Sequence, residues 1–267
     1  MIALKVEHKE IKNMEFGRIR VYSQRGTTPV IFIAPHGVDD KNTDEIAKAA
    51  ADYLDAYAVI NQGFKRSQVV DVLSDKADCN RIDHVTQDVV KEEFLDSIIR
   101  FKGEIDRAAA IEMTRNIPKA ISIEEFKLPI RPLIVIIHGV GSKIHKTAGE
   151  AISCVVGYGQ GKYDDSIICE EWRKNLFVEV FKYYFTQGEI YVGKGGGKYA
   201  ARKKNNMAQY FRLYKKDINV DCLQLEFPLF LRKNKWESTI TGNNLASAVR
   251  DVLLCDSYES DIEIKEI

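Results

Sequence analysis

The sequence lacks an excess of charge of either sign, because its 39 lysine and arginine residues balance its 39 aspartate and glutamate residues. It also lacks any apolar run near the roughly 20 residues that a membrane-spanning helix needs. Residues 1–13 are charged and contain no apolar core of a secretion signal. The balanced charge argues against a general polyanion-binding protein. The missing apolar segments predict a cytoplasmic protein that does not bind membranes, and they leave its oligomeric state open.

Cysteine is present but shows no pairing pattern. The 5 cysteines are odd in number, lie scattered along the chain and form no Cys-x-x-Cys motif. These features are typical of reduced thiols in a cytosolic protein. The chain also lacks linkers, low-complexity runs and internal repeats. We therefore expect residues 1–267 to form a single domain, with a peripheral acidic tail at 256–267.

Short apolar runs bounded by turn residues predict the strands of one sheet. The clearest runs are residues 30–34, 56–61, 132–137 and 221–228. Apolar residues at helical spacing predict helices at 43–54, 86–111, 166–185 and 243–255. We expect Thr43 to cap the first of these helices. One side of the third helix should carry Trp172, Leu176, Val180 and Tyr184. This alternation predicts an α/β domain whose mixed, mostly parallel sheet is flanked by helices.

Two of the predicted strands end in the dipeptide His-Gly, although the sequence has only 5 histidines. His36 follows the strand at 30–34, and His138 follows the strand at 132–137. Ligands bind at the carboxyl ends of strands in open α/β sheets, and neighbouring strands would bring the two imidazoles together. With a carboxylate between them, they would form a His-Asp/Glu-His zinc site with an open fourth position for water. Zinc in such a site polarises a carbonyl group and lowers the pKa of that water.

Two further polar motifs fit the chemistry of such a site. Glu226 lies inside the apolar strand at 221–228, where a carboxylate is unfavourable unless it is paired or catalytic. Beside a metal it could act as a general base, and the alternative is a buried ion pair with an arginine. The dipeptide Asn80-Arg81 could bind a substrate carboxylate through the planar guanidinium, or it could be a surface loop.

Together these motifs resemble the N-formylglutamate amidohydrolase family, which includes enzymes that hydrolyse poly-γ-glutamate and is similar in fold and site to the zinc carboxypeptidases. The motifs are Pro-His-Gly at 35–37, Asn-Thr-Asp-Glu-Ile-Ala at 42–47, Asn-Arg at 80–81, His-Gly at 138–139 and Leu-Gln-Leu-Glu-Phe at 223–227. The resemblance spans residues 31–232. It implies a zinc ion on His36, His138 and one acidic residue, with Glu226 as the general base. It also implies that Arg81 with Asn80 holds a substrate carboxylate, and that Arg202 in the glycine-rich segment 193–202 is a candidate second anion anchor.

The loop after the first histidine offers three carboxylates for the acidic position. Asp40 is the first choice because it precedes the cap of the helix. Glu45 is the rival, although it lies in the first turn of the helix and could instead stabilise the helix N-terminus. Asp39 is the third candidate. Val38 stands where relatives have a second glycine, so we expect the geometry of this loop to differ from theirs.

Residues 194–216 collect basic side chains with aromatic residues between them. Such a segment could bind nucleic acid, form a solvated loop and helix face, or act as a basic lid that attracts an acidic substrate. It is not a phosphate-binding loop, because its glycine spacing is wrong and tyrosine follows the lysine where serine or threonine is needed.

The sequence thus predicts a zinc-dependent amidohydrolase. Its expected substrate is a small-molecule or peptide-like N-acyl compound with a free carboxylate, of the N-formylglutamate or γ-glutamyl kind. One alternative is a polyanion- or nucleic-acid-binding protein that uses residues 194–216. The other alternative is a family member that keeps the fold but has no hydrolytic activity.

Overall fold

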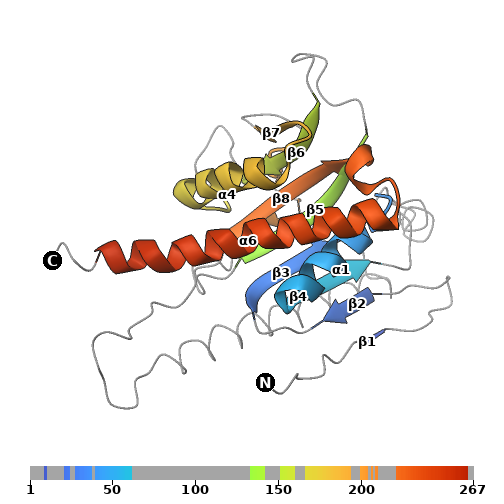
Figure 1. Cartoon of the computed structure of the whole chain (residues 1–267), viewed down its shortest axis with the longest axis horizontal. Coiled ribbons are helices and arrows are strands. Elements are labelled where there is room, and N and C mark those ends of the chain that lie inside the picture. The colour runs from blue at the N-terminus through green and yellow to red at the C-terminus, as the bar shows by residue number, and fades with distance from the viewer. Residues whose placement is uncertain are drawn as a thin grey trace.

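The computed structural model describes residues 9–10, 21–24, 28–37, 40–61, 133–141, 151–159, 166–193, 199–203, 206, 208–209 and 221–263. Within these ranges, eight strands form one sheet in the order β1-β2-β4-β3-β5-β8-β6-β7 (Figure 1). The strands are β1 (Lys9–Glu10), β2 (Val21–Gln24), β3 (Thr28–Ala34), β4 (Ala56–Asn61), β5 (Leu133–Val140), β6 (Ile152–Gly157), β7 (Glu189–Val192) and β8 (Asp221–Pro228). The helices are α1 (Thr43–Leu54), α4 (Glu171–Tyr184), the short 3-10 helix η4 (Leu229–Arg232) and α6 (Lys235–Glu263).

The centre of the sheet is parallel. Strands β4, β3, β5 and β8 pair in parallel, and β2 and β6 add antiparallel strands on the two sides of this group. Every residue of β8 is buried, as expected for a central strand of a parallel sheet. The predicted fold class, an α/β domain with a mixed and mostly parallel sheet flanked by helices, is therefore confirmed.

Helices α1, α4 and α6 lie over one face of the sheet (Figure 1). Their buried side chains form a single core with every second residue of the central strands, including Val135 of β5 and Leu225 of β8. Side chains alternate between the two faces along a strand. His138 of β5 and Glu226 of β8 have the opposite parity, so both point to the face of the sheet away from these helices.

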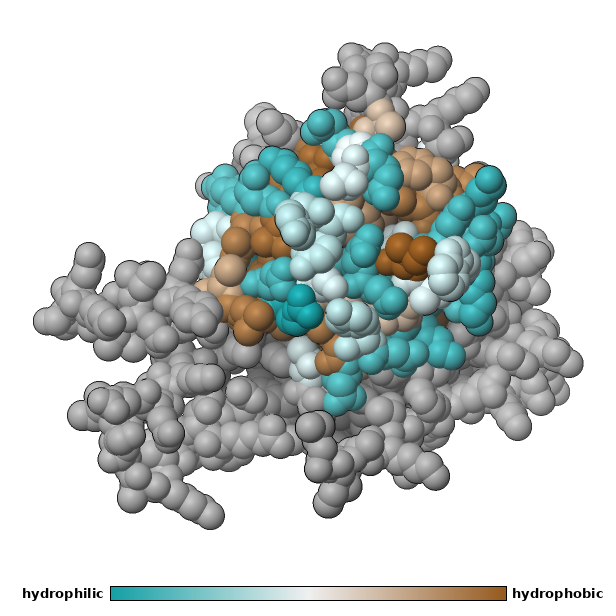
Figure 2. All heavy atoms as spheres, in the orientation of Figure 1, coloured by the Kyte–Doolittle hydropathy of each residue, from teal (hydrophilic) through white to brown (hydrophobic). Residues whose placement is uncertain are grey.

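The face on which α6 lies is mainly hydrophilic, with small and separate apolar patches (Figure 2). Exposed apolar side chains of α6 include Ile240 and Leu254. Scattered residues of this kind are normal on a protein surface. In the part of the chain that the structure describes, no helix is both long enough and apolar enough to cross a membrane.

The starts of two helices differ from the sequence predictions. Asn42, in a left-handed conformation with φ of 64°, is the N-cap of α1, and Thr43 is already helical. Helix α4 begins at Glu171 rather than at 166, and its buried side carries Arg173, Phe177 and Phe181. Leu176, Val180 and Tyr184 of the predicted side are partly buried and pack against the core. Trp172 is 42% exposed, because the fully buried residues lie one position further along the helix than the predicted ones.

Helix α6 is longer than predicted at both ends. It begins at Lys235 and continues to Glu263, so most of the predicted tail at 256–267 belongs to it. Threonine, isoleucine and glycine at 239–242 have low helix propensity, but packing on α1 favours the helix. A Cβ at Gly242 would lie 2.6 Å from the carbonyl oxygen of Ile46, so glycine allows the two helices to approach closely.

Strand β6 was not predicted, although it is buried between β8 and β7 and joins them into the sheet. The predicted helix at 86–111 lies outside the described residues.

A buried ion pair fixes α4 to the start of β8. Nη1 of Arg173 lies 3.2 Å from Oδ2 of Asp221, and both side chains are 0% exposed. The other oxygen, Oδ1 of Asp221, accepts a hydrogen bond from the backbone N–H of Glu170 at 3.0 Å. Removing only the cation would therefore leave a charged carboxylate buried in the core.

We expect Arg173→Met to lower the free energy of unfolding by about 3–5 kcal/mol, the typical cost of breaking one half of a buried ion pair. Denaturant unfolding would measure this loss. The matched control is Lys182→Met, because Lys182 forms an exposed pair with Glu179 on the same helix. That control should change stability by less than about 1 kcal/mol. Equal, small losses in the two variants would contradict a structural role for the buried pair.

Candidate metal centre

The site lies where two neighbouring parallel strands end. Strands β3 and β5 pair in parallel, with Ile33 opposite Ile136, so their carboxyl ends meet at one edge of the sheet. His138 belongs to β5, and His36 lies in the turn that follows β3. The backbone N–H of Asp40 donates to the carbonyl oxygen of His36 at 2.8 Å. This turn folds Asp40 back over the first histidine.

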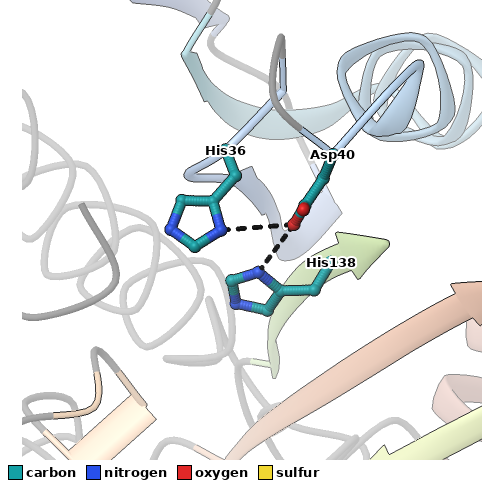
Figure 3. A group of neighbouring side chains, drawn as sticks. All are labelled: His36, Asp40 and His138. Carbon is teal, nitrogen blue, oxygen red and sulfur yellow. Dashed lines mark hydrogen bonds and ion pairs between the residues drawn. The ribbon is translucent and has the colours of Figure 1, made fainter. Parts of the chain in front are cut away.

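The three side chains converge on one point (Figure 3). Oδ2 of Asp40 lies 3.2 Å from Nδ1 of His36 and 3.3 Å from Nδ1 of His138. The two imidazole rings have centroids 4.8 Å apart and are tilted by 59°. The backbone N–H of Gly139 donates to the same Oδ2 at 3.2 Å. One carboxylate oxygen is therefore held by both histidines and by the strand itself.

The environment of Asp40 favours its charged form. Burial alone would raise the pKa of this carboxyl group, but hydrogen bonds from His138 and His36 and the charge of the two rings outweigh that effect. The pKa of Asp40 is consequently held far below its usual range. At neutral pH the site thus contains a carboxylate anion between two nearly buried imidazoles, each 3% exposed.

This donor set fits a zinc ion. Two imidazoles and one carboxylate are a common protein ligand set for catalytic zinc, which leaves the fourth position to water or substrate. Ligand bonds of about 2.0–2.1 Å in a tetrahedron place neighbouring donor atoms about 3.3 Å apart. The two separations between Asp40 and the histidines, 3.2 and 3.3 Å, agree with this value and are also the distances of the hydrogen bonds among these groups. Among the described residues, His36, Asp40 and His138 form a group whose potential ligand atoms all lie within 4.8 Å of one another.

Glu226 lies next to this group. It is the register partner of His138 on the adjacent strand β8 and is 8% exposed. Gln224, two residues earlier on the same face of β8, donates from Nε2 to Oε1 of Glu226 at 3.1 Å. Gln224 in turn accepts a hydrogen bond from Nδ2 of Asn206 at 2.9 Å. A line of side-chain amides therefore fixes the orientation of the Glu226 carboxylate.

Sequence reasoning did not single out Gln224, although a signal was present. Gln224 and Glu226 alternate with leucines in a strand that is otherwise apolar. Polar residues two apart in a strand share one face. This alternation could have indicated that the two side chains interact.

The structure describes two of the three candidates for the acidic position. Asp40 lies beside both histidines, whereas Oε1 of Glu45 lies 3.3 Å from Nζ of Lys235 in a surface ion pair. Asp39, Asn80 and Arg81 lie outside the described residues. Their places in the site stay predictions.

Arg202 is partly exposed, in the short segment 199–203. The backbone N–H of Gly159 donates to the carbonyl oxygen of Ala200 at 2.8 Å, which attaches this segment beyond the end of β6. The predicted role of Arg202 as an anion anchor stays a prediction. The rest of the basic segment 194–216 is described only at residues 206, 208 and 209.

The sheet and its helices have the same fold as solved carboxypeptidase-like hydrolases. A comparison of the sequence with protein-family models finds no match. A comparison with curated proteins also finds none. The fold resemblance predicted from the motifs is confirmed by comparison with solved structures.

One similar structure is N-formylglutamate amidohydrolase from Ralstonia eutropha, with a TM-score of 0.52, 10% identity, and coverage of 86% of this chain and 98% of that chain. Another is a gene product of Agrobacterium tumefaciens, with a TM-score of 0.53, 11% identity, and coverage of 91% and 96% respectively. A third, from Shewanella denitrificans, is described as a putative carboxypeptidase A and matches with a TM-score of 0.51 at 10% identity. This chain covers 64% of that third protein. Likeness at such low identity establishes the fold alone.

Proposed function

We propose that this protein is a zinc-dependent amidohydrolase that cleaves an amide bond in an N-acyl amino acid or peptide-like substrate with a free carboxylate. The observation that carries the proposal is the convergence of His36, Asp40 and His138 at one edge of the sheet. The buried Glu226 beside His138 adds a proton acceptor to this group. The similarity in fold to N-formylglutamate amidohydrolase supports the same chemistry.

The site residues would have two roles, metal binding and proton transfer. His36, His138 and Asp40 would hold the zinc ion, which when bound supplies a Lewis acid that polarises the substrate carbonyl and acidifies water. Glu226 would accept the proton of the attacking water and then donate it to the nitrogen of the leaving amine. Gln224 would keep the Glu226 carboxylate in one orientation while this transfer occurs.

Recognition of the substrate rests on the resemblance described from the sequence. Arg81 with Asn80 would bind the free carboxylate of the substrate through paired hydrogen bonds. Arg202 and the other basic residues of 194–216 would add positive charge that attracts an acidic, γ-glutamyl-like substrate. The proposed partner is thus an acidic small molecule or peptide rather than nucleic acid.

Metal content is the direct test of this proposal. Protein purified without chelator should contain about one zinc ion per chain by elemental analysis, because the three-residue donor set suits a single ion. His36→Ala and His138→Ala should lose most of that zinc and keep their circular dichroism spectra. Arg250→Gln on α6, an exposed residue paired with Asp251, serves as the control and should retain zinc.

Activity assays separate the alternatives. Turnover of N-acylated acidic amino acids or γ-linked glutamyl peptides by the zinc-loaded protein supports the amidohydrolase. Zinc without turnover across both substrate sets would favour an inactive protein with this fold. Salt-dependent binding of a polyanion by metal-free protein, with no zinc in the purified material, would favour the binding protein.

A further inference from the structure

Arg232 is a buried cation next to the loop that carries Asp40 of the candidate metal centre. It ends the 3-10 helix η4, which directly follows β8, and it is 5% exposed. Burial lowers the pKa of its guanidinium, while the nearby charges of Asp40 and Glu226 raise it. A cation in such a place is unfavourable unless its donors are satisfied.

The guanidinium donates to backbone carbonyl oxygens from three separate parts of the chain. Nη1 donates to Asp40 at 3.0 Å and to Lys41 at 2.7 Å, in the loop after β3. Nη2 donates to Val140 at the end of β5 at 3.0 Å. Nε donates to Phe227 near the end of β8 at 3.0 Å. One side chain therefore links the loop that follows β3 to the carboxyl ends of β5 and β8.

The loop also holds Arg232 in return. Nδ2 of Asn42 donates to the carbonyl oxygen of Arg232 at 2.8 Å. The three consecutive loop residues from Asp40 to Asn42 thus all bind Arg232, two through their backbone and one through its side chain.

Gly139 makes room for the guanidinium. A Cβ at this position would lie 2.5 Å from Nη2 and 2.8 Å from Nε of Arg232. Side chains alternate along β5, so the guanidinium packs on the opposite face from the His138 imidazole. Meanwhile the N–H of Gly139 donates to Oδ2 of Asp40. Arg232 and Gly139 therefore hold Asp40 at two points, its carbonyl oxygen and its carboxylate.

We propose that Arg232 is a positioning residue that clamps the Asp40 loop to the ends of β5 and β8, and thereby sets the carboxylate of Asp40 between the two imidazoles. The clamp acts on the chain without any ion. Its consequence for metal affinity rests on the proposed function. A planar guanidinium spreads its donors over three nitrogens in fixed directions, whereas the three donors of a lysine ammonium all lie on one nitrogen at the end of a flexible stem.

The first test uses metal-free protein and so does not depend on zinc. Hydrogen exchange of the Gly139 amide reports whether the Asp40 carboxylate is in place, because that amide donates to it. We expect Arg232→Lys to accelerate exchange at Gly139 by about tenfold, the value of one lost hydrogen bond. Exchange at Val135, inside the same strand, should stay the same. Unchanged exchange at Gly139 in a folded variant would overturn the clamp.

The second test measures zinc affinity by competition with a chromogenic chelator, at a temperature where the metal-free variant is folded. Loss of a residue that orients a ligand typically weakens binding about 10- to 100-fold, and we expect this for Arg232→Lys. A purely structural role would lower the melting temperature but leave the affinity of the folded protein unchanged, and that result would overturn the proposal. Arg250→Gln is the control.

A milder variant covers the case in which Arg232→Lys does not fold. Asn42→Gly keeps the left-handed backbone conformation, which glycine adopts without strain, and removes only the hydrogen bond to Arg232. It should raise exchange at Gly139 severalfold, and no change would count against the clamp. If the wild-type protein binds no zinc but Gly139 responds as expected, the proposed function fails while the clamp stands.

Discussion

Glu226→Gln is expected to remove nearly all turnover while leaving bound zinc in place. The substitution keeps the shape of the side chain and its ability to accept the hydrogen bond from Nε2 of Gln224. It removes the carboxylate that would take a proton from water and pass it to the amine. General acid–base groups typically contribute about 10²–10⁴-fold to a rate, so we expect a loss of kcat of this size with little change in KM.

The measurement is steady-state kinetics on an N-acyl or γ-glutamyl compound that the wild-type protein hydrolyses. Zinc content is determined on the same samples. Glu171→Gln is the control, because Glu171 is an exposed glutamate at the start of α4 and its side chain is 77% exposed. A variant at Glu226 with full zinc and unchanged kcat would refute the role of this residue as the proton acceptor. Loss of zinc together with activity would instead place Glu226 among the metal ligands.

The sequence was sufficient to predict that the two histidines are neighbours, because the same short motif, an apolar run followed by His-Gly, occurs at both of them. Each follows or ends a short apolar run that reads as a buried strand, and each is followed by glycine. Buried parallel strands present their carboxyl ends at one edge, so two such motifs lie together if the strands are adjacent. The structure places β3 beside β5 and brings His36 and His138 together.

Other parts of the site depend on contacts that no local pattern records. Arg232 binds carbonyl oxygens of residues 40, 41, 140 and 227, and backbone oxygens leave no trace in the amino-acid sequence. The space at Gly139 is filled by the guanidinium of Arg232, which lies far away in the sequence and which no motif around the glycine indicates. The N-cap of α1 was misplaced by one residue for the same reason. Asn42 is selected by its backbone conformation and its bond to Arg232, and not by a capping bond of its own side chain.

Asp40→Asn is expected to weaken zinc binding by about 10²-fold or more while preserving the fold. The asparagine oxygen can still accept the hydrogen bond that the Gly139 amide donates to this side chain. The negative charge between the two imidazoles is lost, however, and a neutral amide attracts a divalent cation much less strongly than a carboxylate at the same distance. The same loss removes one of three ligands, so the remaining pair of histidines would hold the ion only weakly.

Glu45→Gln is the matched control, because it makes the same chemical change five residues away on α1. Glu45 faces Lys235, whose side chain is 77% exposed, and such a surface pair contributes at most about 1 kcal/mol to stability. Chelator competition on both variants should therefore show a large loss of affinity at Asp40 and none at Glu45. A large loss of zinc affinity in Glu45→Gln and none in Asp40→Asn would make Glu45 the acidic ligand. It would also mean that the zinc-loaded protein differs in its first loop from the arrangement in Figure 3, since α1 would have to turn or unwind to bring that side chain to the histidines.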